Sequence, residues 1–468
     1  MNKLKPRIYF LIEVKKREFE SRIYFATKAA SLGFSVVIAK KSAIFDRRKN
    51  LQRGLIIFKS IGPNNIKAMI EYKKLGYTIG TIDEEGMMFF SEKHYCASRS
   101  IKNLKLVDIF FCWGKKEYNA IINNYPEFKD KVFITGNQRI DILKNKVNQK
   151  YLKRAKMIKK EHGNFILFTT MFTLANSKMA ESKDINRSNI VNALIKKGWS
   201  EDSDYVRIMK DYIQFQKENI KLSINFIKQF PINFPNKKMI IRPHPNEKAE
   251  LWFELAQKLK NVNVVFDDES TCPWIKASNF LITSNCTTSV ESFMLGKKSI
   301  NFVSNLFTKC QFLAPKMVSE NITSLDQLNN VVEKFNPSFE IDERKNINKK
   351  LAEIIYNCSN ENCSAENMLN ILGKKLNLNE EYKKDKFDNV FYFYFFQFYY
   401  LIRFYYRKFF TKQDKALINL ITQKLKKLYF QEIVETVSEY SHALKIDEKK
   451  LKIKEIYPQV FKIEGSYN

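Results

Sequence analysis

The chain has 468 residues, of which 44% are hydrophobic and 28% are charged, with only 13 Gly and 11 Pro. This length exceeds one compact core and fits two domains, and the composition excludes a disordered or a Gly- and Pro-rich repetitive protein. The formal net charge of +30 attracts polyanions such as nucleic acid, anionic lipid or phosphorylated substrates. Because the lysines are scattered, and because a Lys-rich proteome produces the same excess, the charge alone identifies no partner.

Cysteine and histidine usage argues against a metal protein. The seven Cys include no CxxC pair, and no two of the four His have the spacing of zinc ligands on one helix. We therefore expect reduced thiols in a cytoplasmic protein and no protein-bound metal or cofactor. The apolar run at 8–12 is too short for a signal peptide, and no stretch reaches the roughly 20 apolar residues of a spanning helix.

The first 150 residues alternate between buried strands and amphipathic helices. A strand at 7–14, a helix at 18–32 and a strand at 34–39 form a β-α-β start, which is typical of a parallel, doubly wound sheet. The pattern continues with a helix at 64–75 and strands at 55–58, 77–82, 107–112 and 131–135. Residues 1–150 are therefore predicted to form a Rossmann-like N-terminal lobe.

The same alternation returns after a new strand at 165–170. A long amphipathic helix at 203–229 follows, and residues 344–375 have a helical pattern. Further strands are expected at 238–242, 262–266, 280–283 and 299–303. This pattern predicts a second Rossmann-like lobe over residues 151–378.

The remaining tail, 379–468, has a different composition. Residues 391–410 read FYFYFFQFYYLIRFYYRKFF, an aromatic cluster that suits the membrane–water interface when basic residues flank it. The alternatives are a buried helix across the lobes or an oligomer contact. We predict a helical, membrane-interface tail whose basic flanks are Lys383, Lys384, Lys386, Arg403, Arg407, Lys408 and Lys412.

Three successive carboxylates, Asp83, Glu84 and Glu85, directly follow strand 77–82, and Gly86 permits a sharp turn after them. Mutual repulsion between them raises a pKa, which suits a general acid or base. The alternative is a solvated acidic loop. Because ligands of open α/β sheets sit at the strands' carboxyl ends, these residues are catalytic candidates.

A Pro-bounded histidine follows strand 238–242. Pro243 and Pro245 restrict the loop backbone and hold His244 in place. Arg242 and His244 both suit contact with a phosphate. A lone histidine is usually structural, but the prolines and the position at a strand end favour function here.

A run of small polar residues leads from strand 280–283 into a helix. Hydroxyls and unpaired backbone N–H groups at such a start suit an anion, and a nearby carboxylate suits a ribose. The alternative is an ordinary Ser or Thr N-cap, although the run exceeds what one cap needs. The candidates for donor binding are Ser284, Asn285, Thr287, Thr288, Ser289 and Glu291.

A fourth polar segment follows strand 131–135, at the expected cleft between the lobes. Gly136, Asn137 and Arg139 are candidates for lining that cleft or binding phosphate. Asp141 is either structural, as the cap of the next helix, or catalytic.

Three of these stretches, in this order and spacing, resemble motifs of bacterial glycosyltransferases with the two-lobed GT-B fold. Sialyltransferases and transferases of 3-deoxy-manno-octulosonic acid (Kdo) carry an acidic Asp/Glu-Asp/Glu-Gly motif, a His-Pro motif and a Ser/Thr motif. The matching residues here are Glu84-Glu85-Gly86, or alternatively Asp83-Glu84, for the acidic motif, then His244-Pro245 and Thr287-Thr288-Ser289.

The chain is also similar, over residues 7–305, to the family of surface carbohydrate biosynthesis proteins. Each shared motif is short, and six in order are fairly specific. The shared stretches are REFESR at 17–22, IDEEG at 82–86, WG at 113–114, TGNQRID at 135–141, RPHPNE at 242–247, and SNCTTSVES with LGK at 284–297.

The resemblance implies a metal-independent glycosyltransferase with two Rossmann-like lobes facing a cleft. His244 and residues 287–289 would hold the phosphate of a CMP-activated donor, Kdo or a related 2-keto sugar acid. Glu84 or Glu85 would act as acid or base, and Asp141 is the candidate nucleophile if configuration is retained. The acceptor would be a lipid-linked surface glycan, lipopolysaccharide or capsule, at the inner face of the cytoplasmic membrane.

Three other functions remain open at this point. UDP-sugar 2-epimerases of the same fold also carry a GN-x-x-x-D segment like that at 136–141, and CDP-glycerol-type polyol-phosphate transferases also use His and Ser/Thr groups on phosphate. A nucleic-acid or membrane-binding protein is the non-enzyme alternative. No recognised nucleic-acid motif occurs, so no nucleic-acid partner is expected.

Overall fold

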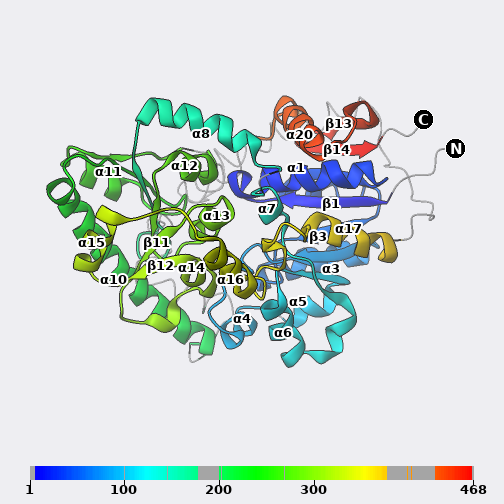
Figure 1. Cartoon of the computed structure of the whole chain (residues 1–468). Helices are drawn as coiled ribbons and strands as arrows, with labels where there is room; N and C mark the ends of the chain where they lie inside the picture. The colour runs from blue at the N-terminus through cyan, green and yellow to red at the C-terminus, as the bar shows by residue number, and fades with distance from the viewer. Residues whose placement is uncertain are drawn as a thin grey trace.

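The chain folds into two α/β lobes that lie side by side (Figure 1). This computed structural model describes residues 6–465 apart from 100, 145, 178–194, 196–199, 202, 268, 377–397, 399–401 and 403–426. Each lobe is built on its own sheet, which agrees with the two doubly wound sheets expected from the alternating pattern.

The first lobe contains an eight-stranded sheet in the order β13-β14-β2-β1-β3-β4-β5-β6. Its six N-terminal strands pair in parallel. They are β1 (Arg7–Ile12), β2 (Ser35–Lys40), β3 (Leu55–Phe58), β4 (Thr78–Ile82), β5 (Ile109–Cys112) and β6 (Val132–Ile134). The helices between them include α1 (Lys15–Ser31), α3 (Ile66–Lys74), α4 (Glu92–Ala97) and α6 (Lys115–Asn124).

Both faces of this sheet are covered, which explains its continuous apolar strands. All six residues of β1 are buried. Ile8 and Phe10 pack into one hydrophobic cluster and Tyr9 and Leu11 into the other, because successive side chains point to opposite faces.

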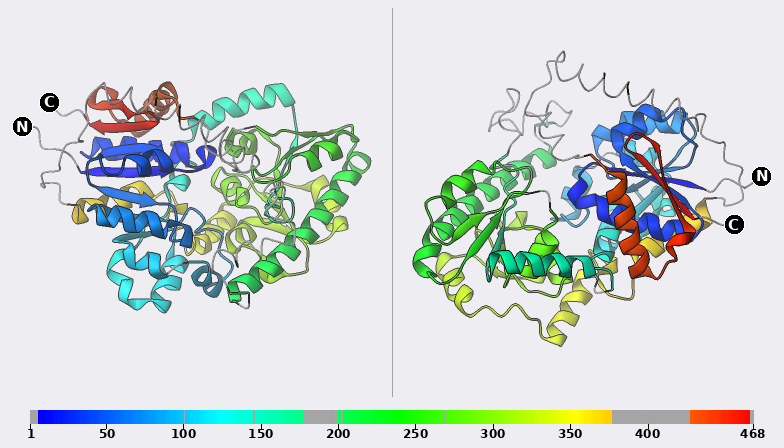
Figure 2. Two further views of the ribbon diagram at one scale, coloured as in Figure 1. Left: turned by 180° about the vertical axis from the view of Figure 1, so that it is seen from behind. Right: turned by 90° about the horizontal axis from the view of Figure 1, so that it is seen from above.

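The C-terminal end of the chain completes the first lobe. After α20 (Phe430–Leu444), strands β13 (Leu451–Tyr457) and β14 (Val460–Gly465) form a hairpin, and β14 pairs antiparallel with β2. The hairpin lies beside α1 in both views of Figure 2. The prediction of a separate helical tail over 379–468 is therefore wrong for its last part. Strand β14 covers the edge of β2, and its residues Val460, Phe461 and Ile463 are buried there, which explains this placement.

The aromatic run at 391–410 lies outside the described residues, except for Phe398 and Ile402. Its membrane-interface role stays a prediction. In the part of the chain that the structure describes, no helix combines the length and apolarity needed to cross a bilayer.

The second lobe contains a six-stranded, fully parallel sheet in the order β12-β11-β10-β7-β8-β9. The strands are β7 (Ile166–Thr169), β8 (Met239–Arg242), β9 (Val262–Val264), β10 (Leu281–Thr283), β11 (Ser299–Phe302) and β12 (Ser319–Ile322). The main helices are α10 (Asp204–Asn233), α11 (Glu250–Ala256), α12 (Thr271–Ala277), α13 (Thr288–Met294), α14 (Leu313–Val318) and α15 (Leu325–Lys334). Strand β12 was not predicted, because its sequence SENI is polar and its middle residues are exposed.

Two segments join the lobes. Helix α8 (Gln149–His162) leads into the second lobe, and the chain returns through α16 (Ile341–Leu351) and α17 (Ser364–Lys375), which the sequence predicted as one helical stretch. Helix α17 packs on α1 and on α7 (Gln138–Asp141) of the first lobe. The last part of the predicted second domain, 151–378, therefore belongs to the first lobe.

A close approach at Gly114 holds this return segment. A Cβ there would lie 2.5 Å from the carbonyl carbon and oxygen of Ile354, so only glycine fits. The Tyr356 N–H donates to the Trp113 carbonyl at 2.7 Å. The WG pair at 113–114 therefore holds the return segment on the first lobe. The two sheets agree with the two Rossmann-like lobes expected.

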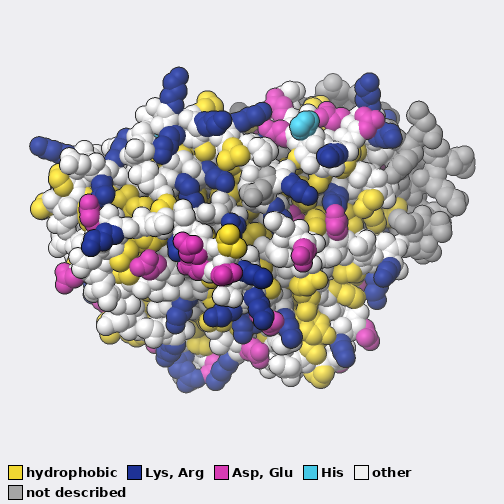
Figure 3. Space-filling view, in the orientation of Figure 1, with side chains coloured by type: hydrophobic (Ala, Val, Ile, Leu, Met, Phe, Trp, Pro, Cys, Tyr) yellow, Lys and Arg dark blue, Asp and Glu magenta, His cyan; other side chains and the backbone are white. Residues whose placement is uncertain are grey.

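Charged side chains are interspersed on the face shown in Figure 3. Lys and Arg are spread over both lobes with Asp and Glu among them. This face presents no single basic surface of the kind that tracks a nucleic-acid backbone.

Candidate functional site

A cleft of about 310 Å³ lies between the lobes. Its walls come from the loops after β4, β7, β8 and β10 and from the first turn of α1. Because the carboxyl ends of parallel strands form one edge of each sheet, the fold brings these distant loops together. Three of the four predicted stretches contribute several residues to the cleft, and the segment after β6 contributes Arg139 and Ile140.

Glu84 and Glu85 both line the cleft but differ in environment. Glu84 is buried, and its carboxylate pairs with Arg22 and lies 3.8 Å from Arg139. Burial acts to raise the pKa of Glu84, but these arginines, with Arg17, lower it below the ordinary value. The Glu85 side chain is exposed to the cleft and makes no hydrogen bond or ion pair among the described residues. Glu85 is therefore the carboxylate available to a substrate.

Asp83 points away from the cleft and is structural. Its carboxylate accepts a hydrogen bond of 2.6 Å from Arg99 Nε and one of 3.4 Å from the Tyr95 hydroxyl, both from the α4 region. Burial raises the pKa of Asp83, and Arg99 opposes that effect. The prediction of Asp83 as a catalytic candidate is not supported by this placement.

Gly86 is required by the ring of Trp113. A Cβ at Gly86 would lie 2.3 Å from Trp113 Cδ1, closer than any real contact. The buried indole donates from Nε1 to the Asp83 carbonyl. Trp113 thus supports the turn that presents Glu84 and Glu85 to the cleft.

Asp141 does not line the cleft. Its carboxylate accepts the backbone N–H groups of Ser364 (3.1 Å) and Ala365 (3.0 Å), which begin α17, and the Asn357 side-chain amide at 2.7 Å. This placement does not support Asp141 as a catalytic nucleophile, because its carboxylate caps α17. The capping alternative holds, although for a helix more than 220 residues away in the sequence.

Gly136 and Asn137 belong to the same lobe junction. Gly136 has a φ of +79° and no room for a Cβ, which would lie 2.2 Å from Asn357 Oδ1. The Asn137 backbone exchanges two hydrogen bonds with the Asn357 side chain. These two residues are therefore structural, and neither reaches the cleft.

Arg139, from the same segment, does line the cleft. Its guanidinium lies 3.8 Å from Glu84 and 3.5 Å from Glu291, so it links the two lobes across the cleft floor. Burial lowers the pKa of Arg139 from its high ordinary value, and burial raises that of Glu291 while Arg139 opposes it. Arg139 and Glu291 are thus paired with each other before any ligand binds.

Arg242 positions a loop. Its guanidinium donates to both Asp267 carboxylate oxygens, at 3.0 and 2.7 Å, and stacks over the Trp274 ring. Burial acts to raise the pKa of Asp267, but the hydrogen bonds from Arg242 lower it. Arg242 touches the cleft, yet its fork is occupied by Asp267 rather than open to phosphate.

His244 lies in the cleft in a defined ring orientation. Its Nδ1 accepts the Asn246 N–H at 3.1 Å, so the neutral ring carries its proton on Nε2. The backbone N–H of His244 donates to Thr170 Oγ1. Pro243 and Pro245 also line the cleft. The loop therefore presents one imidazole with a fixed tautomer.

Glu247 holds this loop from behind. The fully buried carboxylate accepts from Thr170 Oγ1 (2.7 Å), the Phe172 N–H (2.7 Å) and Trp252 Nε1 (3.1 Å). Burial raises the pKa of Glu247 to about 7, against the effect of these hydrogen bonds. The Glu of the RPHPNE stretch is thus a support for the histidine loop.

The polar run after β10 divides into two groups. Thr287 and Thr288 line the cleft, and the Thr288 hydroxyl lies 2.8 Å from that of Thr169. Cys286, between Asn285 and Thr287, also lines it. These hydroxyls face the same space as His244, as the sequence predicted.

The other members of this run are structural. Asn285 has a φ of +52° and accepts the Phe312 N–H at 2.8 Å, and the Ser289 hydroxyl donates to the Cys286 carbonyl at 2.9 Å. Ser284 is buried and absent from the cleft lining. These three residues shape the turn that carries Thr287 and Thr288.

Three cations that the sequence analysis did not single out also line the cleft: Lys16 and Arg17 from the first turn of α1, and Lys59 from the loop after β3. Arg17 pairs with Glu18, and Lys59 lies 2.7 Å from Glu13. Arg17 belongs to the quoted REFESR stretch, which is the signal that could have identified it. Among the described positions, no group of three or more His, Cys, Asp or Glu is arranged to hold a metal ion.

Several solved structures are similar to this chain at low sequence identity. No family model and no curated protein matches this chain. A structure of accessory secretory protein 1, 2 and 3 from Streptococcus pneumoniae is 9% identical with a TM-score of 0.37, covering 72% of this chain and 58% of that one, so this chain spans little more than half of its length. HepE from Anabaena, in complex with UDP and glucose, is 10% identical with a TM-score of 0.43, covering 80% and 99%. UDP-GlcNAc 2-epimerase from Neisseria meningitidis, bound to UDP-GlcNAc, is 14% identical with a TM-score of 0.47, covering 79% and 100%.

Proposed function

We propose that this chain is a glycosyltransferase that uses a CMP-activated 2-keto sugar acid, Kdo or a related sugar, as donor. The observation that carries the proposal is the composition of one cleft. The exposed carboxylate of Glu85 from the first lobe shares it with the imidazole of His244 and the hydroxyls of Thr287 and Thr288 from the second. Sugar transfer from a nucleotide requires two sets of groups: a base for the acceptor, and hydrogen-bond donors that bind the departing phosphate. Here they lie on opposite lobes.

The second-lobe groups would hold the donor phosphate. The His244 ring is oriented by the Asn246 N–H, the Thr288 hydroxyl lies against that of Thr169, and the Thr287 hydroxyl lines the same cleft. Arg17 and Lys59 also line the cleft, where each is paired with a carboxylate of its own lobe, Glu18 and Glu13. Donors that are positioned before reaction stabilise the charge of a departing phosphate without reorganising, so a transfer of this kind needs no added cofactor.

The first-lobe carboxylate would activate the acceptor. Glu85 takes the proton of the acceptor hydroxyl as its oxygen attacks the anomeric carbon. The bond from that carbon to the phosphate oxygen breaks, and CMP leaves with the electron pair. Charge balances, because the proton stays on Glu85 and the negative charge passes to the phosphate.

The contacts of the other carboxylates favour inversion of configuration. Retention requires a second carboxylate that attacks the anomeric carbon. Asp141 caps α17 outside the cleft, and the Glu84 carboxylate is buried against Arg22. We therefore assign a single-displacement reaction with Glu85 as its base.

The acceptor and the location complete the proposal. A lipid-linked surface glycan, and attachment to the inner face of the cytoplasmic membrane, follow from the aromatic run at 391–410 and its basic flanks. When vesicles containing anionic lipid are sedimented, the full chain should be found in the pellet. A chain lacking 391–410 should stay in the supernatant.

The donor is tested by thermal unfolding with CMP, CDP, UDP, UMP and GDP, each at millimolar concentration. A ligand that binds only the folded state adds about 2.7 kcal/mol at a hundred times its Kd. We expect CMP to raise the Tm and His244→Ala to remove that increase. His442→Ala, an exposed histidine on α20, is the matched control and should keep it.

Each other response selects a different function. Stabilisation by UDP would indicate an epimerase or a hexosyltransferase, and stabilisation by CDP a polyol-phosphate transferase. The GN-x-x-x-D segment does not separate these alternatives, because Gly136, Asn137 and Asp141 serve the junction between lobes. If none of the five nucleotides changes the Tm, the proposed donor class is wrong.

A further inference from the structure

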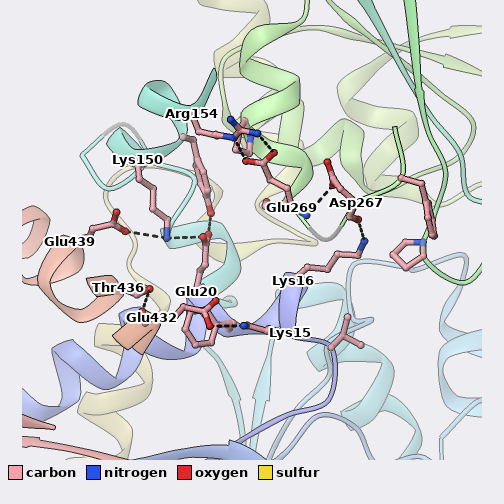
Figure 4. A pocket seen from close by; sticks show the side chains of 17 residues that line it. Lys15, Lys16, Glu20, Lys150, Arg154, Asp267, Glu269, Glu432, Thr436 and Glu439 are labelled. Carbon is pink, nitrogen blue, oxygen red and sulfur yellow. Dashed lines mark hydrogen bonds and ion pairs between the residues drawn. The ribbon is translucent and has the colours of Figure 1, made fainter. Parts of the chain in front are cut away.

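A second cavity, of about 700 Å³, opens directly from the cleft. It is more than twice as large as the cleft and shares Glu20, Pro245, Phe266 and Asp267 with it. Its walls are the first turns of α1, the start of α8, the loop before α12, and α20 (Figure 4). The space next to the candidate base therefore continues outward between the lobes, within the range of about 300–1,000 Å³ that is usual for ligand sites.

Helix α20 supplies the outer wall through Glu432, Thr436 and Glu439. In Figure 4 the Glu432 side chain points toward that of Lys15, and the Glu439 side chain points toward that of Lys150. The Lys15 ammonium lies 2.5 Å from Glu432, and that of Lys150 lies 2.7 Å from Glu20 and 3.5 Å from Glu439. A C-terminal helix thus completes a site that begins at the cleft.

The cations on the opposite wall are engaged too. Arg154 binds the Glu269 carboxylate at 2.5 and 3.1 Å, and the Lys16 ammonium donates to the Asp267 carbonyl at 3.0 Å. Among the described residues, four cations and five carboxylates line the cavity. Their charges nearly balance, so a phosphate or an acidic sugar gains little there and would have to break existing pairs.

Such a lining suits a neutral polyhydroxyl ligand. Sugar hydroxyls donate to carboxylate oxygens and accept from ammonium groups, so they can join the existing pairs without displacing them. Phe19 and Phe266 also line the cavity, with Lys15 and Lys16 near their rings, and offer apolar faces for the C–H surface of a sugar.

We propose that this cavity binds the acceptor as a neutral oligosaccharide, with the α20 wall contacting the sugars beyond the one that reacts. The inference rests on the proposed transferase function, since it places the acceptor hydroxyl at Glu85 and the rest of the glycan toward Glu439. It assigns acceptor selection to a segment outside the motifs shared with other surface-carbohydrate proteins.

The test is binding of the full chain to an immobilised glycan array containing neutral, sialylated and phosphorylated oligosaccharides. We expect binding to neutral members. Thr436→Trp, which fills the cavity from α20, should weaken it by about tenfold or more, and Glu439→Ala by about tenfold, the usual cost of losing a hydrogen bond to a charged group. Glu435→Ala, exposed one turn away on the same helix, is the control and should bind like the unaltered chain.

The response of Tm to CMP, measured on the same variants, separates the two proposals. Unchanged CMP stabilisation with lost glycan binding supports the cavity assignment. Binding restricted to sialylated or phosphorylated glycans, binding unaffected by both α20 variants, or no binding to any glycan would overturn it. Failure of all nucleotides to stabilise the protein would reject the donor class while leaving the array result to decide the cavity. If Thr436→Trp does not fold, Glu439→Ala alone decides, because that side chain is 52% exposed and tolerates truncation.

Discussion

Three adjacent carboxylates after β4 have three different environments. Asp83 is bound by Arg99, Glu84 by Arg22, and Glu85 faces the cleft without a partner among the described residues. The paired carboxylates have their lone pairs engaged by guanidinium groups, so they are poor bases toward a substrate hydroxyl. At the scale of single residues, accessibility rather than residue type selects Glu85.

Replacement of this base gives the first prediction. Glu85→Gln should lower kcat for CMP release from CMP-Kdo by about 100- to 10,000-fold, the usual contribution of a general base. Stabilisation by CMP should not change, because the nucleotide groups lie on the other lobe. Glu127→Gln, an exposed glutamate of the same lobe, should leave both measurements unchanged. A Glu85→Gln enzyme of full activity would exclude this residue as the base.

A glycine contact gives the second prediction. Gly86→Ala should reduce the free energy of unfolding by about 1–3 kcal/mol, because the new methyl group overlaps Trp113. Gly373→Ala, in α17, meets no atom within 4 Å and should stabilise the protein by about 0.4–1 kcal/mol. Urea denaturation of both variants measures the two effects. Equal changes in the two would mean that the Trp113 contact does not constrain the turn.

Helix α17 shows how an element depends on a distant residue. Its first N–H groups, at Ser364 and Ala365, have no intrahelical acceptors and are satisfied by Asp141 of the first lobe. Asn357, in the turn before α17, binds the same carboxylate and the Asn137 backbone. The return of the chain from the second lobe is therefore locked by one buried carboxylate.

Removal of this cap gives the third prediction. Asp141→Ala should lower the free energy of unfolding by about 1–3 kcal/mol, since it leaves buried donors unpaired. Asp342→Ala, in the exposed first turn of α16, should change it by no more than about 0.5 kcal/mol. At a temperature where the variant is folded, its kcat should equal that of the unaltered enzyme. A lost kcat without lost stability would restore Asp141 as a nucleophile.

At the scale of the whole molecule, buried carboxylates make stability depend on pH. Glu117 is buried, receives hydrogen bonds from the Trp113 N–H (2.6 Å) and the Tyr95 hydroxyl (2.5 Å), and lies near Asp83. Burial, followed by the charge of Asp83, raises the pKa of Glu117 from an ordinary 4.5 to about 8. Between these values the folded chain holds a proton that the unfolded chain has released, so stability falls as pH rises.

The fourth prediction follows from that sign. In Glu117→Gln, whose side chain is neutral at every pH, the free energy of unfolding should fall less between pH 5 and pH 8 than in the unaltered chain. The two proteins should differ most on the alkaline side, where the native carboxylate is forced to ionise. Glu92→Gln, exposed on α4, should show the native slope. Guanidinium denaturation at several pH values measures the free energy of unfolding of each protein. If this free energy depends on pH in the same way for Glu117→Gln and the unaltered chain, the raised pKa of Glu117 is contradicted.

The sequence by itself determined the two lobes and the edge at which the cleft forms. Apolar strands alternating with amphipathic helices can bury both strand faces only in a parallel, doubly wound sheet, and polar loops must then follow the strand ends. This local reasoning placed His244, Thr287, Thr288 and Glu85 correctly in one cleft.

Only the tertiary structure decided which members of each polar stretch face the ligand. Arg22, Arg99 and Asn357 are distant in sequence from the carboxylates that they bind, so neither pattern nor spacing could show that Asp83 and Asp141 are structural. The hairpin of β13 and β14 was missed for a related reason. Its apolar residues gain their burial from β2, more than 400 residues earlier, and strand pairing at such separation has no local signal.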